Sequence, residues 1–231
     1  MNRQSGANLM ETYEVMKTTF AARSFTDRVI SNETLYRILD HARFAPSGGN
    51  RQGWKVLVIT EPSLRTDLQT LMAPTIQAYK AMAVAGETPF NSISPSAVPQ
   101  ASIDAMSPDM PFTGQLTQAP VVLVVTVDLN LVTAFDKDLD RVGVIAGASI
   151  YPFVWNILLA ARNEGLGGVL TTFLSHSEPE AKRLLGIPTD YAIAALVGIG
   201  EPTRQLTKLK RHPVTAFTAL NHFSGAPLDA S

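Results

Sequence analysis

The spacing of apolar residues predicts helices in the first third of the chain. Apolar side chains recur every three to four positions within residues 9–20, within residues 35–42 and again after Pro62. Ser31 or Asn32 can cap the second segment, because a short polar side chain accepts a backbone N–H at a helix start. Proline is favoured in a first helical turn, so we expect the third helix to begin at Pro62.

Shorter apolar runs predict buried strands at residues 54–60, 119–128, 169–173 and 191–199. The second run is nearly all β-branched, which favours a central strand covered on both faces. A further helix is expected near 178–185, where Ser177 and Glu180 have the spacing of a capping box. Helices and strands alternate, so we expect an α+β or α/β fold in which helices cover a small sheet.

Residues 142–161 carry no charge, and we expect them to form most of a helix over 142–164. Twenty apolar residues could span a bilayer. The run includes Ser149, Pro152 and Asn156 and stands alone in the chain, which favours a helix buried in a protein without membrane spans. Burial on all sides in so small a domain indicates that a second subunit covers it.

Residues 85–118 differ in character from the rest of the chain. They hold five of the fifteen prolines and no basic residue, and they show no periodicity. Phe90 and Phe112 could anchor this segment as a lid on the rest of a single domain spanning residues 1–231. A loose insertion is the alternative reading.

Composition excludes several functional classes. The 231 residues are 45% hydrophobic and 17% charged, with a net charge of −1, so bulk charge does not attract nucleic acid. The chain has no cysteine, which excludes disulfides and thiolate chemistry. The first residues lack the apolar run of a secretory signal, so we expect a cytoplasmic protein.

Familiar catalytic motifs are also missing. The four histidines are scattered without metal-ligand spacing, and there is no GxSxG elbow or phosphate-binding P-loop. An enzyme without an evident nucleophile, metal or acid–base cluster often takes its reactivity from a cofactor.

Two features of the sequence could bind a cofactor. The turn at residues 46–54 (PSGGNRQGW) combines glycines, amides and a hydroxyl, so its backbone could approach a polar heteroaromatic ring. A plain helix-stopping turn is the alternative. Arg23 and the basic tail around Lys208 and Arg211 could converge on a phosphate, or could be solvated surface charges.

These segments resemble the nitroreductase family. Residues 19–25 lie where that family has R-[RH]-S-x-[RK]-x-F, and residues 45–54 resemble its A-P-S-x-x-N-x-Q-P-W block. Further blocks follow in the family's order: Gly165–Gly167, Leu170–Thr172, Gly198–Pro202 and Lys210–Pro213. The resemblance covers most of the chain except residues 85–118.

The resemblance implies an α+β, nitroreductase-like α/β sandwich with a central, mostly antiparallel sheet flanked by helices. It also implies an intertwined homodimer with two flavin mononucleotide (FMN) sites, each shared between subunits. Arg23 would lie at the flavin edge or phosphate, and Arg211, with Lys208, would bind the phosphate. The remaining implied contacts are Pro46, Ser47, Gly48, Asn50 and Gln52 from the partner subunit, and Leu170, Thr171 and Thr172 beside the isoalloxazine ring.

The chain departs from the family pattern at the phosphate. Thr19 stands where the family has its first arginine, and Ala21 where it has a serine, so part of the usual clamp is missing. Lys17, Lys208 and Lys210 are the cations that could compensate.

The predicted reaction is a ping-pong transfer in which NAD(P)H reduces FMN at N5 and a small electron-poor acceptor then takes the reducing equivalents. Nitroaromatics, quinones and activated enones are the expected acceptors. The chemistry belongs to the flavin, so no catalytic side chain and no metal are expected. The alternatives are reductive dehalogenation or related flavin chemistry, and a flavin-binding protein without turnover.

Overall fold

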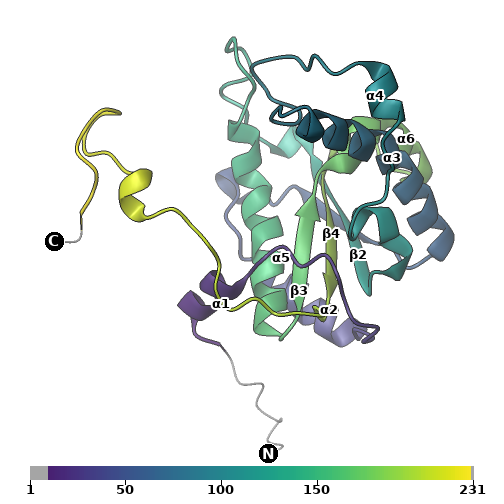
Figure 1. The fold of residues 1–231 in the computed structure, drawn as a ribbon. Coiled ribbons are helices and arrows are strands. Elements are labelled where there is room, and N and C mark those ends of the chain that lie inside the picture. Colours follow the sequence, from purple (N-terminus) through teal and green to yellow (C-terminus); the bar gives the residue numbers. More distant parts are fainter. Residues whose placement is uncertain (1–9, 230–231) are drawn as a thin grey trace, which may run out of the picture.

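The structure is a computed structural model and describes residues 10–229. Its centre is one antiparallel sheet of four strands in the order β1-β2-β4-β3 (Figure 1). The strands are β1 (Trp54–Val58), β2 (Val121–Asp128), β3 (Gly167–Thr171) and β4 (Tyr191–Gly200). All four predicted strands are present, and the β-branched run is central, as expected.

Helices cover both faces of the sheet, which confirms the α+β sandwich. Helices α2 (Asn32–Ala42) and α5 (Tyr151–Asn163) pack on one face. The other face is covered by α3 (Pro62–Val84) and α6 (Glu178–Leu185). Both faces of β2 are therefore buried, which explains why its apolar residues run continuously instead of alternating.

The helix ends follow the local sequence in part. The Ser31 hydroxyl accepts the Thr34 N–H at 3.1 Å, so the predicted cap is present. Helix α6 has the predicted bounds, but the capping box at its start is wrong. Ser177 donates its hydroxyl to Leu71 O at 2.8 Å instead, because α3 packs close by. The first helix, α1 (Thr12–Thr18), is shorter than predicted, and residue 9 of that prediction lies outside the described residues.

The prediction of one long helix over residues 142–164 is wrong. Helix α5 begins only at Tyr151, after 3₁₀ turns over Ile145–Ser149 and a non-helical Ile150. Two glycines weaken helix formation before it, and Pro152 is suited to a first turn rather than an interior one. The helix is also not buried on all sides in one chain, since Tyr151 and Trp155 are 43% and 45% exposed.

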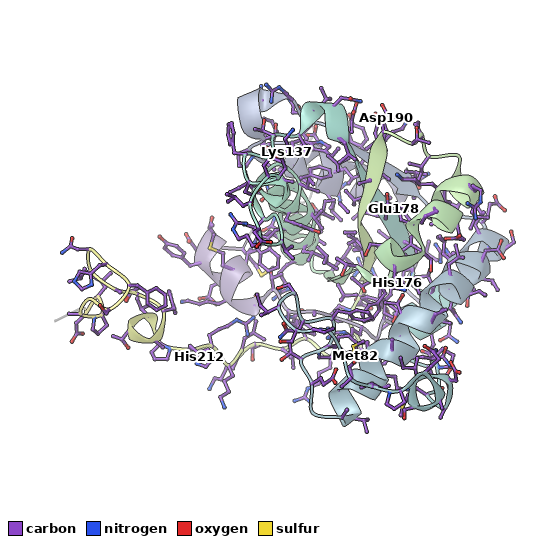
Figure 2. All side chains as sticks on the ribbon, turned by 90° about the horizontal axis from the view of Figure 1, so that it is seen from above. Met82, Lys137, His176, Glu178, Asp190 and His212 are labelled. Carbon is purple, nitrogen blue, oxygen red and sulfur yellow. The ribbon has the colours of Figure 1, made fainter. Side chains whose placement is uncertain are left out.

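The segment 85–118 contains a short helix, α4 (Gln100–Asp104), and 3₁₀ turns within Thr113–Gln118. Phe112 and Leu116 are buried against the face that α3 covers. After β4 the chain first runs along the body, where the Gln205 amide donates to Thr18 O at 3.1 Å. It then forms a tail that stands away from the body in two views, with His212 along it (Figures 1 and 2). None of the helices in the described part of the chain is long and apolar enough to cross a membrane.

Candidate functional site

A pocket of about 250 Å³ brings together residues that are far apart in the sequence. It contains Arg23 from the first loop and Leu170, Thr171 and Thr172 from the end of β3. All four belong to the predicted flavin contacts. The pocket is completed by Tyr79, Val169 and Phe173, and by Met110–Thr113 of the 85–118 segment.

The loop that carries Arg23 is attached to the sheet at both ends. Ala21 forms a bridge to Gly168, where the Ala22 N–H donates to Gly168 O at 3.0 Å. Phe25 forms the second bridge, to Pro202. A Cβ at Gly167 would lie 2.9 Å from the Ala22 Cβ, so this close approach requires glycine.

An ion pair secures the far side of the same loop. Glu201 accepts the Thr26 hydroxyl at 2.9 Å and an Arg28 guanidinium N–H at 3.1 Å. These two hydrogen bonds lower the pKa of the Glu201 carboxyl below its usual value, and the bond from Thr26 has the larger effect. The loop is therefore fixed beside β3, and Arg23 is held at the pocket.

Arg23 is exposed and is not paired with a carboxylate anywhere in residues 10–229. Its guanidinium donates only to the neighbouring Ala21 O, at 3.3 Å. A free guanidinium next to backbone groups at a strand end can stabilise negative charge on a ligand. The donor set thus fits an anionic group or the polar edge of a heteroaromatic ring such as a flavin.

The turn after α2 is built as its sequence suggests, but it does not line this pocket. The Ser47 hydroxyl accepts the Gln52 N–H at 3.0 Å, and the Gln52 amide donates to Asn50 Oδ1 at 3.1 Å. Gly48 N–H donates to Ser149 Oγ at 3.0 Å. Asn50 and Gln52 both have positive φ, a conformation that asparagine tolerates best among residues with side chains. Pro46 lies at the start of this turn.

The basic tail also lies apart from the pocket in the single chain. Lys208 and Arg211 are exposed, and the Arg211 guanidinium donates to Lys210 O at 2.8 Å. The structure therefore brings together Arg23 with Leu170–Thr172, and leaves the remaining predicted contacts on two separate surfaces of the chain.

The position of the missing family arginine is inside the protein. Thr19 is 5% exposed and donates its hydroxyl to Val15 O at 2.7 Å. Lys17 is one of the cations that could replace this arginine, and its Nζ lies 3.4 Å from Glu14 Oε1. Arg162 of α5 lies beside this position, and its Nε donates to Thr18 Oγ1 at 3.0 Å. Burial lowers the pKa of the Arg162 guanidinium, which is the signature of a cation partly removed from water.

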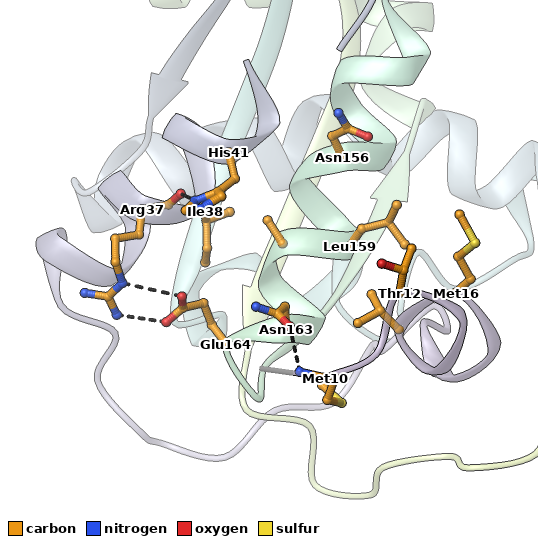
Figure 3. A pocket seen from close by; sticks show the side chains of 12 residues that line it. Met10, Thr12, Met16, Arg37, Ile38, His41, Asn156, Leu159, Asn163 and Glu164 are labelled. Atoms are coloured by element: carbon orange, nitrogen blue, oxygen red, sulfur yellow. Dashed lines mark hydrogen bonds and ion pairs between the residues drawn. The ribbon is translucent and has the colours of Figure 1, made fainter. Parts of the chain in front are cut away.

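A second pocket, of about 470 Å³, lies between α1, α2 and α5 (Figure 3). Its charged groups are satisfied internally. Arg37 donates to both carboxylate oxygens of Glu164, at 2.8 and 3.4 Å, and Asn163 accepts the Met10 N–H at 3.1 Å. The pKa of the Arg37 guanidinium is raised, first by its hydrogen bond to Glu164 and then by the negative charge of Glu164. The rest of the wall is mostly apolar, which suits a packing surface better than an anion site.

Comparison with known proteins identifies the family. The model of the Nitroreductase family matches residues 17–201. A nitrobenzene nitroreductase of Ectopseudomonas oleovorans is 25% identical, over 88% of this chain and 95% of the relative. The NADPH:FMN oxidoreductase from Vibrio harveyi, solved with NAD+, has a TM-score of 0.63 at 20% identity, over 92% of this chain and 77% of that one. An oxidized iodotyrosine deiodinase bound to FMN and 3-iodo-L-tyrosine has a TM-score of 0.66 at 20% identity, over 92% of this chain and all of that one.

The fold and the family match define an FMN-dependent oxidoreductase. The chain belongs to the nitroreductase family. The resemblance predicted from the sequence is confirmed.

Proposed function

We propose that this protein takes reducing equivalents from NAD(P)H and passes them to a small electron-poor acceptor, a nitroaromatic, a quinone or an activated enone. The observation that carries the proposal is the convergence of Arg23 with Leu170, Thr171 and Thr172 in one pocket. NAD+ is the ligand of the similar Vibrio harveyi enzyme, and the E. oleovorans relative is a nitrobenzene nitroreductase, which supports this donor and acceptor class. A cytoplasmic location, where NAD(P)H is regenerated, is part of the proposal.

When bound, FMN would supply two-electron chemistry that no side chain of this protein provides. The work of the chain is then binding and orientation. Arg23 would place a positive charge beside the ring, and the backbone of Leu170–Thr172 would offer hydrogen-bonding groups at its edge. Lys208 and Arg211 would hold the phosphate, with Arg162 as a further candidate in place of the missing arginine at Thr19.

We further propose a homodimer in which each site takes residues from both subunits. The Pro46–Gln52 turn and the tail do not reach the Arg23 pocket of their own chain. A second copy could supply both. The tail stands away from the body and exposes apolar side chains that a partner could cover, Val214, Phe217, Leu220 and Phe223.

The exposed face of α5 is the proposed contact surface. A groove of about 880 Å³ runs along one side of it and is lined mainly by apolar residues, among them Val144, Tyr151 and Trp155. The pocket of Figure 3 flanks the other side, at Asn156 and Leu159. An apolar surface of this extent is typical of a subunit interface. Contact with a second subunit along this surface would bury α5 on all sides, as the sequence predicts.

We propose that residues 1–231 form one domain in which the 85–118 segment is a lid over the flavin pocket. Met110–Thr113 line the pocket, and Phe112 is buried. A lid of this kind would limit water and select the acceptor.

Reductive dehalogenation is the second candidate. It is favoured by the similarity to iodotyrosine deiodinase, whose structure holds an iodinated aromatic substrate. A flavin-binding protein without turnover is the remaining alternative. Dependence of NAD(P)H oxidation on a halogenated acceptor would favour the dehalogenase, and bound flavin without turnover on any acceptor would favour the binding protein.

The first experiment is an absorbance spectrum of the purified protein, with the released cofactor identified by mass. A flavin spectrum with the mass of FMN, followed by NAD(P)H oxidation that depends on a nitroaromatic or quinone, is the expected result. A colourless protein that does not bind added FMN would refute the proposal.

A further inference from the structure

Two side chains of α3 hold the backbone of the lid. The Gln77 amide donates to Met106 O at 2.7 Å. The Lys80 ammonium donates to Ser107 O at 2.8 Å and to Asp109 O at 3.4 Å. Helix α3 runs beside α4 and the 3₁₀ turns of the lid (Figure 1), so these bonds join segments that are neighbours in space but 27 to 29 positions apart in the sequence.

The three carbonyl groups depend on these two side chains. No backbone N–H within residues 10–229 donates to Met106 O, Ser107 O or Asp109 O. Ser107 and Asp109 are exposed, so their carbonyl groups would turn to water if the donors were removed. Loss of the donors should therefore loosen this stretch of the lid locally, without unfolding the core.

A third side chain of α3 holds the lid further along the chain. Gln69 accepts the Leu116 N–H at 3.0 Å through its Oε1. Gln69, Gln77 and Lys80 are separated by eight and three positions, which places them on one side of the helix. The stretch between Asp109 and Leu116 is thus attached to α3 at both of its ends.

The stretch between these two attachments forms part of the flavin pocket. Met110 and Pro111 follow Asp109 directly and line the pocket. Tyr79, the neighbour of Lys80 in α3, lines it as well. Phe112 comes next, with a positive φ of 68°, and such a strained conformation persists only where the surrounding structure enforces it. The attachments to α3 are therefore part of what keeps this wall of the pocket in place.

We propose that Gln77 and Lys80 are positioning residues that hold Met110 and Pro111 at the flavin pocket, and that the fixed wall restricts the site to small acceptors. The inference rests on the proposed function, in which the 85–118 segment is a lid. A side chain held at a pocket wall excludes an acceptor that needs its space, whereas a loosened wall gives way to it.

The test compares Lys80→Met with Lys80→Arg. Methionine keeps an unbranched side chain that favours a helix but removes the donor, and arginine keeps the donor and the charge. We expect the ratio of kcat/KM for phenanthrenequinone to kcat/KM for benzoquinone to rise roughly two- to tenfold in Lys80→Met, the equivalent of one hydrogen bond. It should stay within twofold in Lys80→Arg. Gln77→Met should shift the ratio in the same direction as Lys80→Met.

Hydrogen–deuterium exchange gives a second readout that needs no acceptor. Peptides that cover residues 106–116 should exchange faster in Lys80→Met than in the unsubstituted protein, both with FMN and as the apoprotein. Exchange in the four strands should be the same in the two proteins, because the lost bonds lie outside the sheet. FMN affinity should stay within twofold.

Lys182→Met is the matched control. Lys182 of α6 also donates to a backbone carbonyl, Thr189 O at 3.3 Å, and forms an ion pair with Glu178 at 2.8 Å. Both of these contacts lie outside the lid. The variant should leave the acceptor ratio and the exchange of residues 106–116 unchanged.

An unchanged acceptor ratio in Lys80→Met, or an equal rise in Lys80→Arg, would overturn the inference. So would exchange that is faster throughout the chain, which would indicate general destabilisation, or a larger loss of FMN affinity, which would make the stretch a cofactor contact. An unsubstituted protein that binds no FMN, or that oxidises NAD(P)H with neither quinone, would instead overturn the proposed function and with it the role in acceptor choice. Exchange in the apoprotein would then still show whether Lys80 holds this stretch on α3.

Discussion

The aromatic ring of Phe112 lies against the backbone of Gly198, so that a Cβ at position 198 would overlap the ring. Glycine at the end of β4 therefore makes room for a side chain from the lid. Because Gly198 pairs with both Val122 and Val169, the contact joins the lid to the centre of the sheet and to the strand that ends in the flavin pocket.

Gly198→Ala should force Phe112 out of its position. We expect a loss of about 1–3 kcal/mol in the free energy of unfolding, as for other overpacked cores, together with a raised KM for the acceptor. Denaturant unfolding and steady-state kinetics measure the two effects. The double variant with Phe112→Ala relieves the overlap, so its loss should be clearly smaller than the sum of the single losses. Simple additivity would show that the two residues do not interact.

Trp155→Arg should disrupt the proposed dimer. The indole is 45% exposed on α5, and a charge placed there would lose water on subunit contact. Sedimentation should show a monomer, and FMN should be lost with it because the sites are shared. Val29→Arg, at a position that is 88% exposed in a loop, is the control and should stay dimeric. A Trp155→Arg protein that remains dimeric with full FMN content would contradict this interface.

Arg211→Ala should weaken FMN retention by roughly 1.5–3 kcal/mol, the usual value of a charge-assisted contact. The measurement is a fluorescence titration of the apoprotein with FMN. Arg204→Ala is the matched control, because Arg204 is also exposed in the tail but lies outside the matched basic block. Equal FMN affinity in the two variants would remove Arg211 from the phosphate site.

Asp136 should stabilise the fold in a pH-dependent way. Its carboxylate accepts the Val144 N–H at 2.7 Å, an Arg141 N–H at 2.7 Å and the Ile145 N–H at 3.3 Å. These bonds lower the pKa of the Asp136 carboxyl, and the bond from Val144 has the largest effect. Because the pKa of this carboxyl is lower in the folded protein than in the unfolded chain, its ionised form stabilises the fold. This stabilisation is present above the unfolded-state pKa of about 4 and is lost as the pH falls through the folded-state pKa.

Asp136→Asn should therefore be less stable than the unsubstituted protein at pH 7, and the difference should shrink as pH falls below about 4. Unfolding measured at a series of pH values gives both curves. Asp138→Asn, at an exposed neighbouring position, should follow the unsubstituted curve. A gap between the Asp136→Asn and unsubstituted curves that stays constant with pH would show that the Asp136 charge is not what stabilises this segment.

The sequence by itself determined the elements whose signals are local. Helix α6 has the bounds that were predicted, and the β-branched run became β2 at the centre of the sheet. Apolar period, proline at a helix start and a short polar cap act over a few residues, so they can be read without knowing what packs against them. The family blocks also identified the family, since each block is a short local motif.

Only the tertiary structure decided how those residues meet. Arg23 lines the same pocket as Thr171 because Ala21 and Phe25 bridge to residues more than a hundred positions away, and no local pattern encodes such a pairing. The lid is a similar case. Nothing in the spacing of residues 85–118 shows that the Phe112 ring will pack on Gly198 or that Met110–Thr113 will line the pocket with Arg23. Contacts between distant segments depend on the shape of the assembled core, and that shape exists only in the folded chain.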